Sequence, residues 1–312
     1  MKKVFVNKFG QLRSGWKIAI TLLITAVFII LFTVVILAAS VISSLMDSSS
    51  QSNLLDIYLI ENALSEIQHS ALLKFLSRMI TPLSMIIATF FVLKVIDKRK
   101  LYQVGITPLR TNYKDLLFGL VLGTSSITII FFVLLSTGNI SLDLPLTSPH
   151  LSSNILTGLL WLILVGFGEE LFGRGYCMTA LYQTGDIRVA FIISSAIFSL
   201  LHGMNPNISL IPLLNIFSIG LLFAYMFFKT GNLWMPIGYH IAWNYFQGIV
   251  FGFPVSGLSI RGIYSTNILY NNILTGGLFG PEGGIITTMV IIVGFFIVGS
   301  YSRQRRNLIF GI

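Results

Sequence analysis

The chain has 312 residues, of which 54% are hydrophobic and only 10% are charged, whereas about 25% of the residues in an average soluble protein are charged. This composition excludes a soluble globular protein, and apolar runs that recur from residue 18 to residue 300 indicate one membrane domain over residues 1–312. The net charge of +9 does not indicate nucleic-acid binding, because the basic residues cluster at the ends of the apolar runs. We therefore expect a protein embedded in the lipid bilayer of a cell membrane, without a nucleic-acid partner.

Eight apolar segments predict membrane-spanning helices. They cover about residues 18–46, 79–96, 116–135, 154–182, 188–203, 208–228, 233–251 and 285–301. The first segment is far longer than the core of a signal peptide, so we expect an uncleaved helix. The positive-inside rule places both termini in the cytoplasm, because only Lys74, Arg78 and Arg261 then lie outside. The predicted fold is an all-α, polytopic bundle of about eight transmembrane helices.

The connecting segments fit this topology. Residues 47–70 are polar and predict an outer loop with a short surface helix, and Pro82 lies near the expected outer end of the second span. The basic segment 97–114 predicts a cytoplasmic loop, and the basic end 303–306 is cytoplasmic as well. A Gly- and Asn-rich segment, 252–283, predicts an outer loop.

The fourth span carries charged residues where a lipid-facing helix tolerates them least. It contains Glu169, Glu170 and Arg174. A charged side chain at mid-membrane costs about 3 kcal/mol even on insertion scales, so such residues usually face the protein interior and mark a functional site. This span is therefore the first candidate for the site.

Polar residues of two other spans reach a similar depth. His202 ends the fifth span, while His240 and Asn244 lie one turn apart on the same face of the seventh. A rise of about 1.5 Å per residue from the cytoplasmic ends places Glu169 and His202 at about 21 Å, Asn244 at about 18 Å and His240 at about 12 Å. Since buried polar groups in hydrocarbon require partners, we expect these side chains to converge in one layer.

The two adjacent glutamates have different expected roles. Glu170 and Arg174 are spaced i, i+4 and predict an ion pair along the helix, whereas Glu169 points about 100° away. A carboxylate without a cation in a poorly solvated site is suited to act as a general base. We expect the glycines of this stretch to let neighbouring helices approach closely; they are Gly166, Gly168, Gly173 and Gly175.

Each polar residue also has a structural interpretation. An architectural ion pair accounts for Glu170 with Arg174, helix-to-helix hydrogen bonds account for the histidines, and packing accounts for Phe198. A thiol nucleophile at Cys177 is less favoured than a small buried residue. Serine nucleophiles beside His202 are less favoured than serines that bond to the helix backbone; the candidates are Ser194, Ser195 and Ser199. A proton or ion relay uses the same residue types, so transport is a further alternative.

Three motifs stand out across these spans. They read EExxxR at Glu169-Glu170-Leu-Phe-Gly-Arg174, FxxxH at Phe198-Ser-Leu-Leu-His202, and HxxxN at His240-Ile-Ala-Trp-Asn244. Together and in this order, over about residues 115–250, they resemble the CPBP family. That family comprises the type II CAAX prenyl endopeptidases and the bacteriocin-processing and self-immunity proteins, also called Abi. The resemblance implies eight membrane helices, a catalytic core at 115–250, and endoproteolysis within or beside the membrane.

The resemblance also implies how the site works. Glu169 and His202 match the pair that activates the attacking water, and His240 with Asn244 matches the pair that stabilises the oxyanion. Peptide hydrolysis needs a base and also needs donors aimed at the developing charge. These four residues would supply both.

The remaining motif residues bear on substrate and function. Glu170 and Arg174 match the pair that holds the site together or contacts substrate, and Phe198 is grouped with them as substrate-binding or structural. The expected function is that of an intramembrane endopeptidase acting on a peptide or membrane protein. The alternative is a non-enzymatic immunity or regulatory protein that binds a peptide or partner in the same cavity.

No cofactor is expected, although zinc is possible. Glu169, His202 and His240 are the residue types of a His2Glu zinc site. Their spacing lacks the HExxH pairing, no carboxylate in another span is seen to orient a ligating imidazole, and His240 lies about 9 Å from the level of the other two. We therefore favour metal-independent catalysis.

Overall fold

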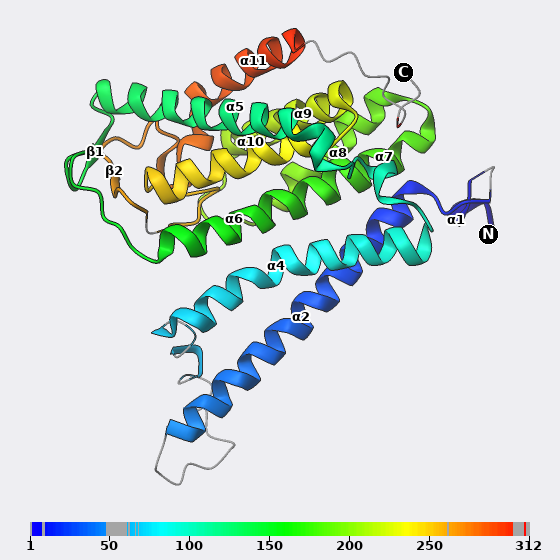
Figure 1. The fold of residues 1–312 in the computed structure, drawn as a ribbon, viewed down its shortest axis with the longest axis horizontal. Helices are drawn as coiled ribbons and strands as arrows, with labels where there is room; N and C mark the ends of the chain where they lie inside the picture. Colours follow the sequence, from blue (N-terminus) through cyan, green and yellow to red (C-terminus); the bar gives the residue numbers. More distant parts are fainter. Residues whose placement is uncertain are drawn as a thin grey trace.

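The computed structural model describes residues 2–7, 10–47, 61, 63–65, 67, 69–260, 262–301 and 309. Within them the chain is a bundle of helices with one small antiparallel sheet (Figure 1). The longer helices are α2 (Ser14–Asp47), α4 (Ala71–Phe91), α5 (Leu109–Ser136), α6 (Asn154–Glu170), α8 (Ile187–Leu201), α9 (Leu210–Thr230), α10 (Trp234–Asn244) and α11 (Ile285–Ser300). The short elements are α1 (Lys2–Phe5), α7 (Thr179–Leu181), β1 (Ile140–Leu142) and β2 (Thr266–Ile268).

The predicted all-α polytopic fold is confirmed. A helix covers each of the eight predicted apolar segments. Five helical stretches among the described residues are long and apolar enough to cross a bilayer: Ser14–Ser43, Ala71–Ile96, Leu101–Ser136, Asn154–Thr184 and Leu210–Thr230. Two further apolar helices, α8 and α11, are shorter. The chain is therefore a multi-pass membrane protein.

Three helices continue as π-helix where their α-helical part ends. The π segments are Val92–Ile96 after α4, Leu171–Met178 after α6, and Tyr245–Val250 after α10. Such wide turns are rare and frequently lie at functional sites. The second and third begin directly after the motif residues Glu170 and Asn244, so both motif helices change their winding at the motif.

Helix α4 begins earlier than predicted. The expected start was Met79, but the helix begins at Ala71, where the Ser70 side chain accepts a hydrogen bond from the Leu73 N–H at 3.3 Å and caps the first turn. Pro82 lies inside the helix rather than at its end. A proline is tolerated there because neighbouring elements can satisfy the freed backbone group.

A two-stranded sheet joins the two long loops between helices. Strands β1 and β2 pair antiparallel, with Ile140 opposite Ile268. The sequence predicts an outer loop where β2 lies, and strands of three residues are too short to show a period in it. The sheet fastens the segment before α6 to the segment before α11.

Parts of the prediction concern residues outside the described ones. In the segment 47–70, the described residues 61, 63–65, 67 and 69 are helical, as expected for a surface helix. The rest of its polar stretch, Arg261 and the basic end 303–306 lie outside the described residues.

The elements that carry the site pack closely around α10. A Cβ at Gly119 of α5 would collide with the carbonyl oxygen of Met235, and a Cβ at Gly238 would lie 2.5 Å from the carbonyl oxygen of Leu116. The backbones of α5 and α10 therefore touch, which fixes the helix that presents the third motif. Helices α2 and α4 lie to one side of this bundle, and the C-terminal end of α2 points away from it (Figure 1).

The glycines around the first motif mostly behave as predicted. Gly166 lies against Ile241 of α10, Gly168 against α4, and Gly175 against the carbonyl oxygen of Val104. Gly173 is the exception, because its nearest neighbour is the Phe198 ring at 4.0 Å. It borders a cavity instead of a neighbouring helix.

Candidate active site

The three motifs meet at one cavity. Their residues come from α6 and its π segment (Glu169, Glu170, Arg174), from α8 and its C-terminal cap (Phe198, His202) and from α10 (His240, Asn244). The cavity has a volume of about 770 Å³ and a predominantly apolar wall. Five motif residues line it, namely Glu169, Phe198, His202, His240 and Asn244. The predicted convergence of three spans is thus observed.

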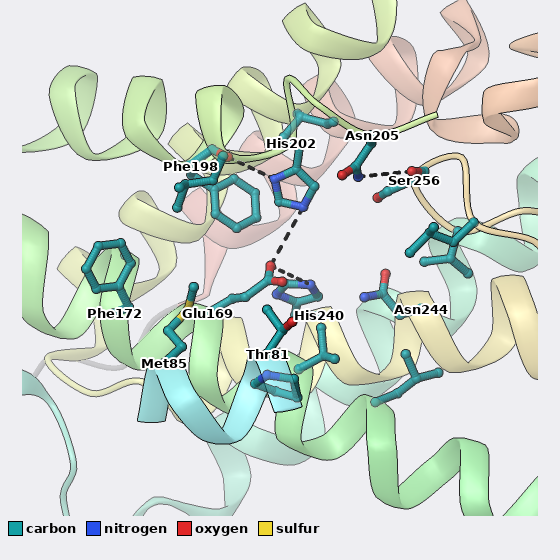
Figure 2. Close-up of a pocket in the computed structure, with 18 of the residues that line it drawn as sticks. Thr81, Met85, Glu169, Phe172, Phe198, His202, Asn205, His240, Asn244 and Ser256 are labelled. Carbon is teal, nitrogen blue, oxygen red and sulfur yellow. Dashed lines mark hydrogen bonds and ion pairs between the residues drawn. The ribbon is translucent and has the colours of Figure 1, made fainter. Parts of the chain in front are cut away.

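Glu169 lies between the two imidazole rings (Figure 2). Its Oε2 atom is 3.8 Å from Nε2 of His202 and 3.8 Å from Nε2 of His240. These distances are too long for direct hydrogen bonds, and Oε2 is buried without a hydrogen-bond partner among the described residues. A small molecule held between this oxygen and the two nitrogens can exchange protons with each of the three side chains.

The hydrogen bonds at Nδ1 determine what each ring presents to Glu169. Nδ1 of His202 is 2.9 Å from the carbonyl oxygen of Phe198, which can only accept, so this nitrogen carries the proton. Nδ1 of His240 is 3.0 Å from Oε1 of Glu170 and donates to it. In the neutral rings, both Nε2 atoms are therefore proton acceptors. Protonation of either ring places a new N–H beside Glu169.

Glu170 and Arg174 form a fully buried ion pair behind the cavity wall. Nη1 of Arg174 lies 3.0 Å from Oε1 of Glu170, and both side chains are 0% exposed. Nη2 donates to the Gly220 carbonyl oxygen at 3.1 Å. The guanidinium lies over the rings of Phe198 at 4.1 Å and Phe223 at 5.0 Å. The predicted pair is confirmed, and Phe198 holds its cation by a cation–π contact in addition to packing.

Two sequence arguments about geometry were wrong. The depth calculation separated His240 from Glu169 by about 9 Å, whereas the side chains face each other at 3.8 Å. A uniform rise along parallel helices ignores helix tilt, side-chain reach and the π segment after α6. No carboxylate in another span was expected to orient an imidazole, yet Glu170 of α6 does so for His240 of α10.

The alternative nucleophiles lie away from the cavity wall. Cys177 is 0% exposed and packs in a hydrophobic cluster with the π segment. Ser199 donates to the carbonyl oxygen of Leu213 at 2.7 Å, and Ser194 donates to that of Phe191 at 3.3 Å. None of these side chains lines the cavity. Ser194 and Ser199 bond to backbone carbonyls as expected, whereas the buried Ser195 hydroxyl has no hydrogen-bond partner among the described residues.

Sequence reasoning missed several residues of the cavity. Asn205, Ser256 and Glu282 line it from the loops after α8 and before α11, and Arg78 lines it from α4. Arg78 lies over the Trp161 ring at 5.4 Å, so it is part of the cavity wall and not a loop residue. A sequence signal existed for Glu282, because it is a lone acidic residue in the glycine-rich stretch 276–284.

No group of three or more His, Cys, Asp or Glu side chains among the described residues is arranged to hold a metal ion. Glu169, His202 and His240 do face one another, but with 3.8 Å between the carboxylate oxygen and each nitrogen. Direct bonds from zinc to such ligands are about 2.0–2.2 Å.

These features define a polytopic membrane protein with a carboxylate and two imidazoles at the wall of an apolar cavity. Residues 151–246 match the family model described as "Type II CAAX prenyl endopeptidase Rce1-like". This segment contains all three motifs, so the predicted resemblance to the CPBP family is confirmed.

A curated relative agrees with the family match. Over 111 residues the chain is 31% identical to the Bacillus subtilis (strain 168) protein described as "Putative membrane peptidase YdiL". The aligned stretch covers 36% of this chain and 41% of that protein, so it spans less than half of the relative's length. No solved structure matches the chain significantly.

Proposed function

We propose that the protein is an intramembrane endopeptidase that hydrolyses peptide bonds of a membrane-associated protein or peptide. The observation that carries this proposal is the placement of Glu169 Oε2 at 3.8 Å from Nε2 of both His202 and His240 at the cavity wall. The family match over residues 151–246 and the name of the B. subtilis relative support the same class of activity.

Glu169 and His202 activate the water in this mechanism. A water held between them loses a proton to one of these groups while its oxygen forms a bond to the carbonyl carbon of the substrate. The tetrahedral intermediate collapses as the C–N bond breaks. The proton removed from water passes to the departing nitrogen, so the products are a carboxyl group and an amine and both side chains return to their starting states.

His240 and Asn244 stabilise the oxyanion. They lie one turn apart on α10, and both line the cavity. When the His240 ring is protonated at Nε2, it presents an N–H there while Nδ1 still donates to Glu170. The side-chain amide of Asn244 supplies a second donor. Such donors in a dry site contribute about 3–4 kcal/mol each to the stabilisation of the transition state.

The substrate enters from the bilayer or its surface in this proposal. The cavity wall includes residues of α2, α4 and α6, and α2 and α4 lie to one side of the other helices (Figure 1). The predominantly apolar wall fits a hydrophobic segment of a membrane protein or a lipid-associated peptide. The catalytic core remains residues 115–250, with both termini of the chain in the cytoplasm.

Comparison of membrane peptides tests the activity directly. Cells that contain the wild-type chain are compared with cells that contain Glu169→Gln, which keeps the shape of the side chain and removes the base. We expect peptides whose new ends depend on the wild-type chain. Matched expression and folding of the two proteins, with identical peptide patterns, would instead favour a non-enzymatic immunity or regulatory protein that binds a partner in the cavity.

A further inference from the structure

An arginine without a counter-ion lines the cavity. Arg78 lies on α4, one turn before Pro82, and its side chain is half-buried. None of the ion pairs among the described residues includes it, and no motif contains it. A charged side chain in a membrane-spanning helix is costly and usually marks a functional site. Arg78 therefore calls for an anionic partner that is not a side chain of the described residues.

The Trp161 ring of α6 orients the guanidinium group of Arg78. The guanidinium carbon lies over this ring at 5.4 Å from its centre, and both residues line the cavity. Stacking uses the flat face of the guanidinium and leaves its N–H groups free to bind an anion by two parallel hydrogen bonds. The indole N–H of Trp161 also makes no hydrogen bond to another described residue. Two neighbouring residues of the wall thus carry donors without acceptors.

These two residues lie at the end of the cavity where α4 and α6 begin. The helices are parallel, because Arg78 contacts Trp161 and, further along both helices, a Cβ at Gly168 would lie 3.3 Å from the carbonyl oxygen of Pro82. Arg78 and Trp161 each lie about 10 Å along their helix from its first residue. Helical side chains lean toward the N-terminal end, and a long basic side chain extends to the membrane interface. Tryptophans are enriched at the same level.

The rest of the cavity offers an apolar channel that opens toward lipid. Glu169 lies about 12 Å further along α6 than Trp161, and Leu162 and Val165 line the cavity between them. On the facing side, Ala26 of α2 lines the cavity and is exposed. Exposed apolar side chains of α2 flank Ala26 on both sides in the sequence, and such a surface faces acyl chains in a bilayer. A molecule can therefore enter the cavity from the lipid beside α2.

We propose that the cavity binds one glycerophospholipid, with its phosphate at Arg78 and Trp161 and an acyl chain along the apolar wall toward Glu169. The phosphate supplies the missing negative charge and enough oxygen atoms for both donors. Its place near the membrane interface keeps it about 12 Å from the level of the Glu169 carboxylate. A peptide carboxylate matches the charge alone, whereas a phospholipid also matches the apolar channel and the opening beside α2. The site goes beyond the proposed function, because lipid binding requires no cleavage.

Direct binding of phosphatidylglycerol tests the role of Arg78. The full-length protein in dodecyl maltoside micelles is equilibrated with the radiolabelled lipid, and the lipid bound per chain is counted after gel filtration. Lys74→Gln is the matched control for Arg78→Gln, because Lys74 lies one turn earlier on α4, is exposed and does not line the cavity. We expect the wild type and Lys74→Gln to bind alike, and Arg78→Gln to bind about tenfold more weakly. Wild-type affinity in folded Arg78→Gln would overturn the proposal.

Competitors separate the phosphate from the acyl chain. Diacylglycerol has the chains without the phosphate, and inorganic phosphate has the charge without the chains. Each should displace the labelled lipid at least about tenfold less well than unlabelled phosphatidylglycerol does. Equal displacement by diacylglycerol would show that Arg78 does not recognise the phosphate, and equal displacement by inorganic phosphate would show that the site takes the free ion; either result refutes the phospholipid site. Failure to bind the lipid, together with Arg78-dependent binding of an apolar peptide only when its C-terminal carboxylate is free, would assign the cavity to a peptide instead.

A second pair of variants covers the case in which Arg78→Gln does not fold. Ala26→Trp places a large ring in the opening of the cavity, on an exposed face of α2 that can accept it. Leu23→Trp is its control, because Leu23 is 66% exposed on the same helix and does not line the cavity. Phosphatidylglycerol should bind about tenfold more weakly to Ala26→Trp and as in the wild type to Leu23→Trp. Equal binding to both would refute the proposed position of the acyl chain. If the lipid binds as expected while the wild type cleaves nothing, the lipid site stands and the endopeptidase proposal alone fails.

Discussion

Oε1 of Glu170 accepts a hydrogen bond from Nδ1 of His240 at 3.0 Å, across two helices and 70 positions of sequence. The same oxygen is 3.0 Å from Nη1 of Arg174. Glu170 therefore links the ion pair inside one helix to the orientation of an imidazole on another. The motif glutamate that does not line the cavity fixes a ring that does.

Loss of the Glu170 charge should damage both stability and catalysis. In Glu170→Gln, Arg174 becomes a buried cation without its counter-ion, and an uncompensated buried charge costs about 3–5 kcal/mol. Denaturant titration in micelles should show this loss of unfolding free energy relative to the wild type. Stability equal to the wild type would show that Gly220 and the two rings suffice to hold Arg174.

Replacement of Glu169 should lower the cleavage rate and leave the unfolding free energy nearly unchanged. Its Oε2 makes no hydrogen bond among the described residues, so Glu169→Gln should unfold close to the wild-type denaturant concentration. Removal of a general base costs about 10²–10⁴-fold in rate, and we expect that loss in cleavage by purified protein. His202→Ala should behave in the same way. Wild-type cleavage by folded Glu169→Gln would show that another group is the base.

Phe198 should contribute to the site through Arg174. The guanidinium carbon lies 4.1 Å from the centre of the ring, and a desolvated cation–π contact contributes about 2 kcal/mol. Phe198→Leu keeps an apolar side chain and removes the π-face, so its unfolding free energy should fall by about that amount. Phe296→Leu is the matched control, because Phe296 on α11 is 75% exposed within the protein. Equal losses in the two variants would contradict a special contact at Phe198.

The sequence predicted what depends on local pattern. Apolar runs reveal helices one at a time, and a charged residue in such a run is conspicuous against its neighbours, which is why Glu169, Glu170 and Arg174 were found. The i, i+4 pairing was predicted correctly because one helix contains both partners. The meeting of His202 with Glu169 followed from three spans with polar residues at similar depth.

The sequence could not show features that depend on the orientation of the helices and on the path of the loops. The contact between His240 and Glu169 depends on how their helices are oriented, and a depth calculated from the rise per residue gives no information on helix orientation. Glu282 enters the cavity through a loop whose course depends on hydrogen bonds from Asn205 and Asn215, residues that are far from it in sequence. The role of Phe198 as a partner of Arg174 likewise exists only after α8 packs against the π segment.

Cysteine labelling tests the proposed membrane topology. Arg110 lies near the start of α5 and His150 lies before α6, and both are exposed. The buried thiol of Cys177 is replaced by alanine, which adds no polar group to the core. A cysteine at residue 150 should react with an impermeant thiol reagent outside intact cells, whereas a cysteine at residue 110 should react only after permeabilisation. The reverse pattern would place the termini on the outer side.

Metal analysis tests the mechanism independently of topology. The structure removes two sequence arguments against zinc. His240 is not too far from Glu169, because the two side chains face each other. An oxygen atom also accepts a hydrogen bond from Nδ1 of each ring, as is usual for histidines that bind metal. The proposed mechanism needs no metal, because it uses Glu169 and His202 as the base and His240 with Asn244 as the donors. We therefore expect chelator-washed protein to contain less than one zinc per ten chains and to keep its cleavage rate, as measured by elemental analysis beside an activity assay. Stoichiometric zinc whose removal abolishes cleavage, and whose return restores it, would instead assign Glu169, His202 and His240 as metal ligands.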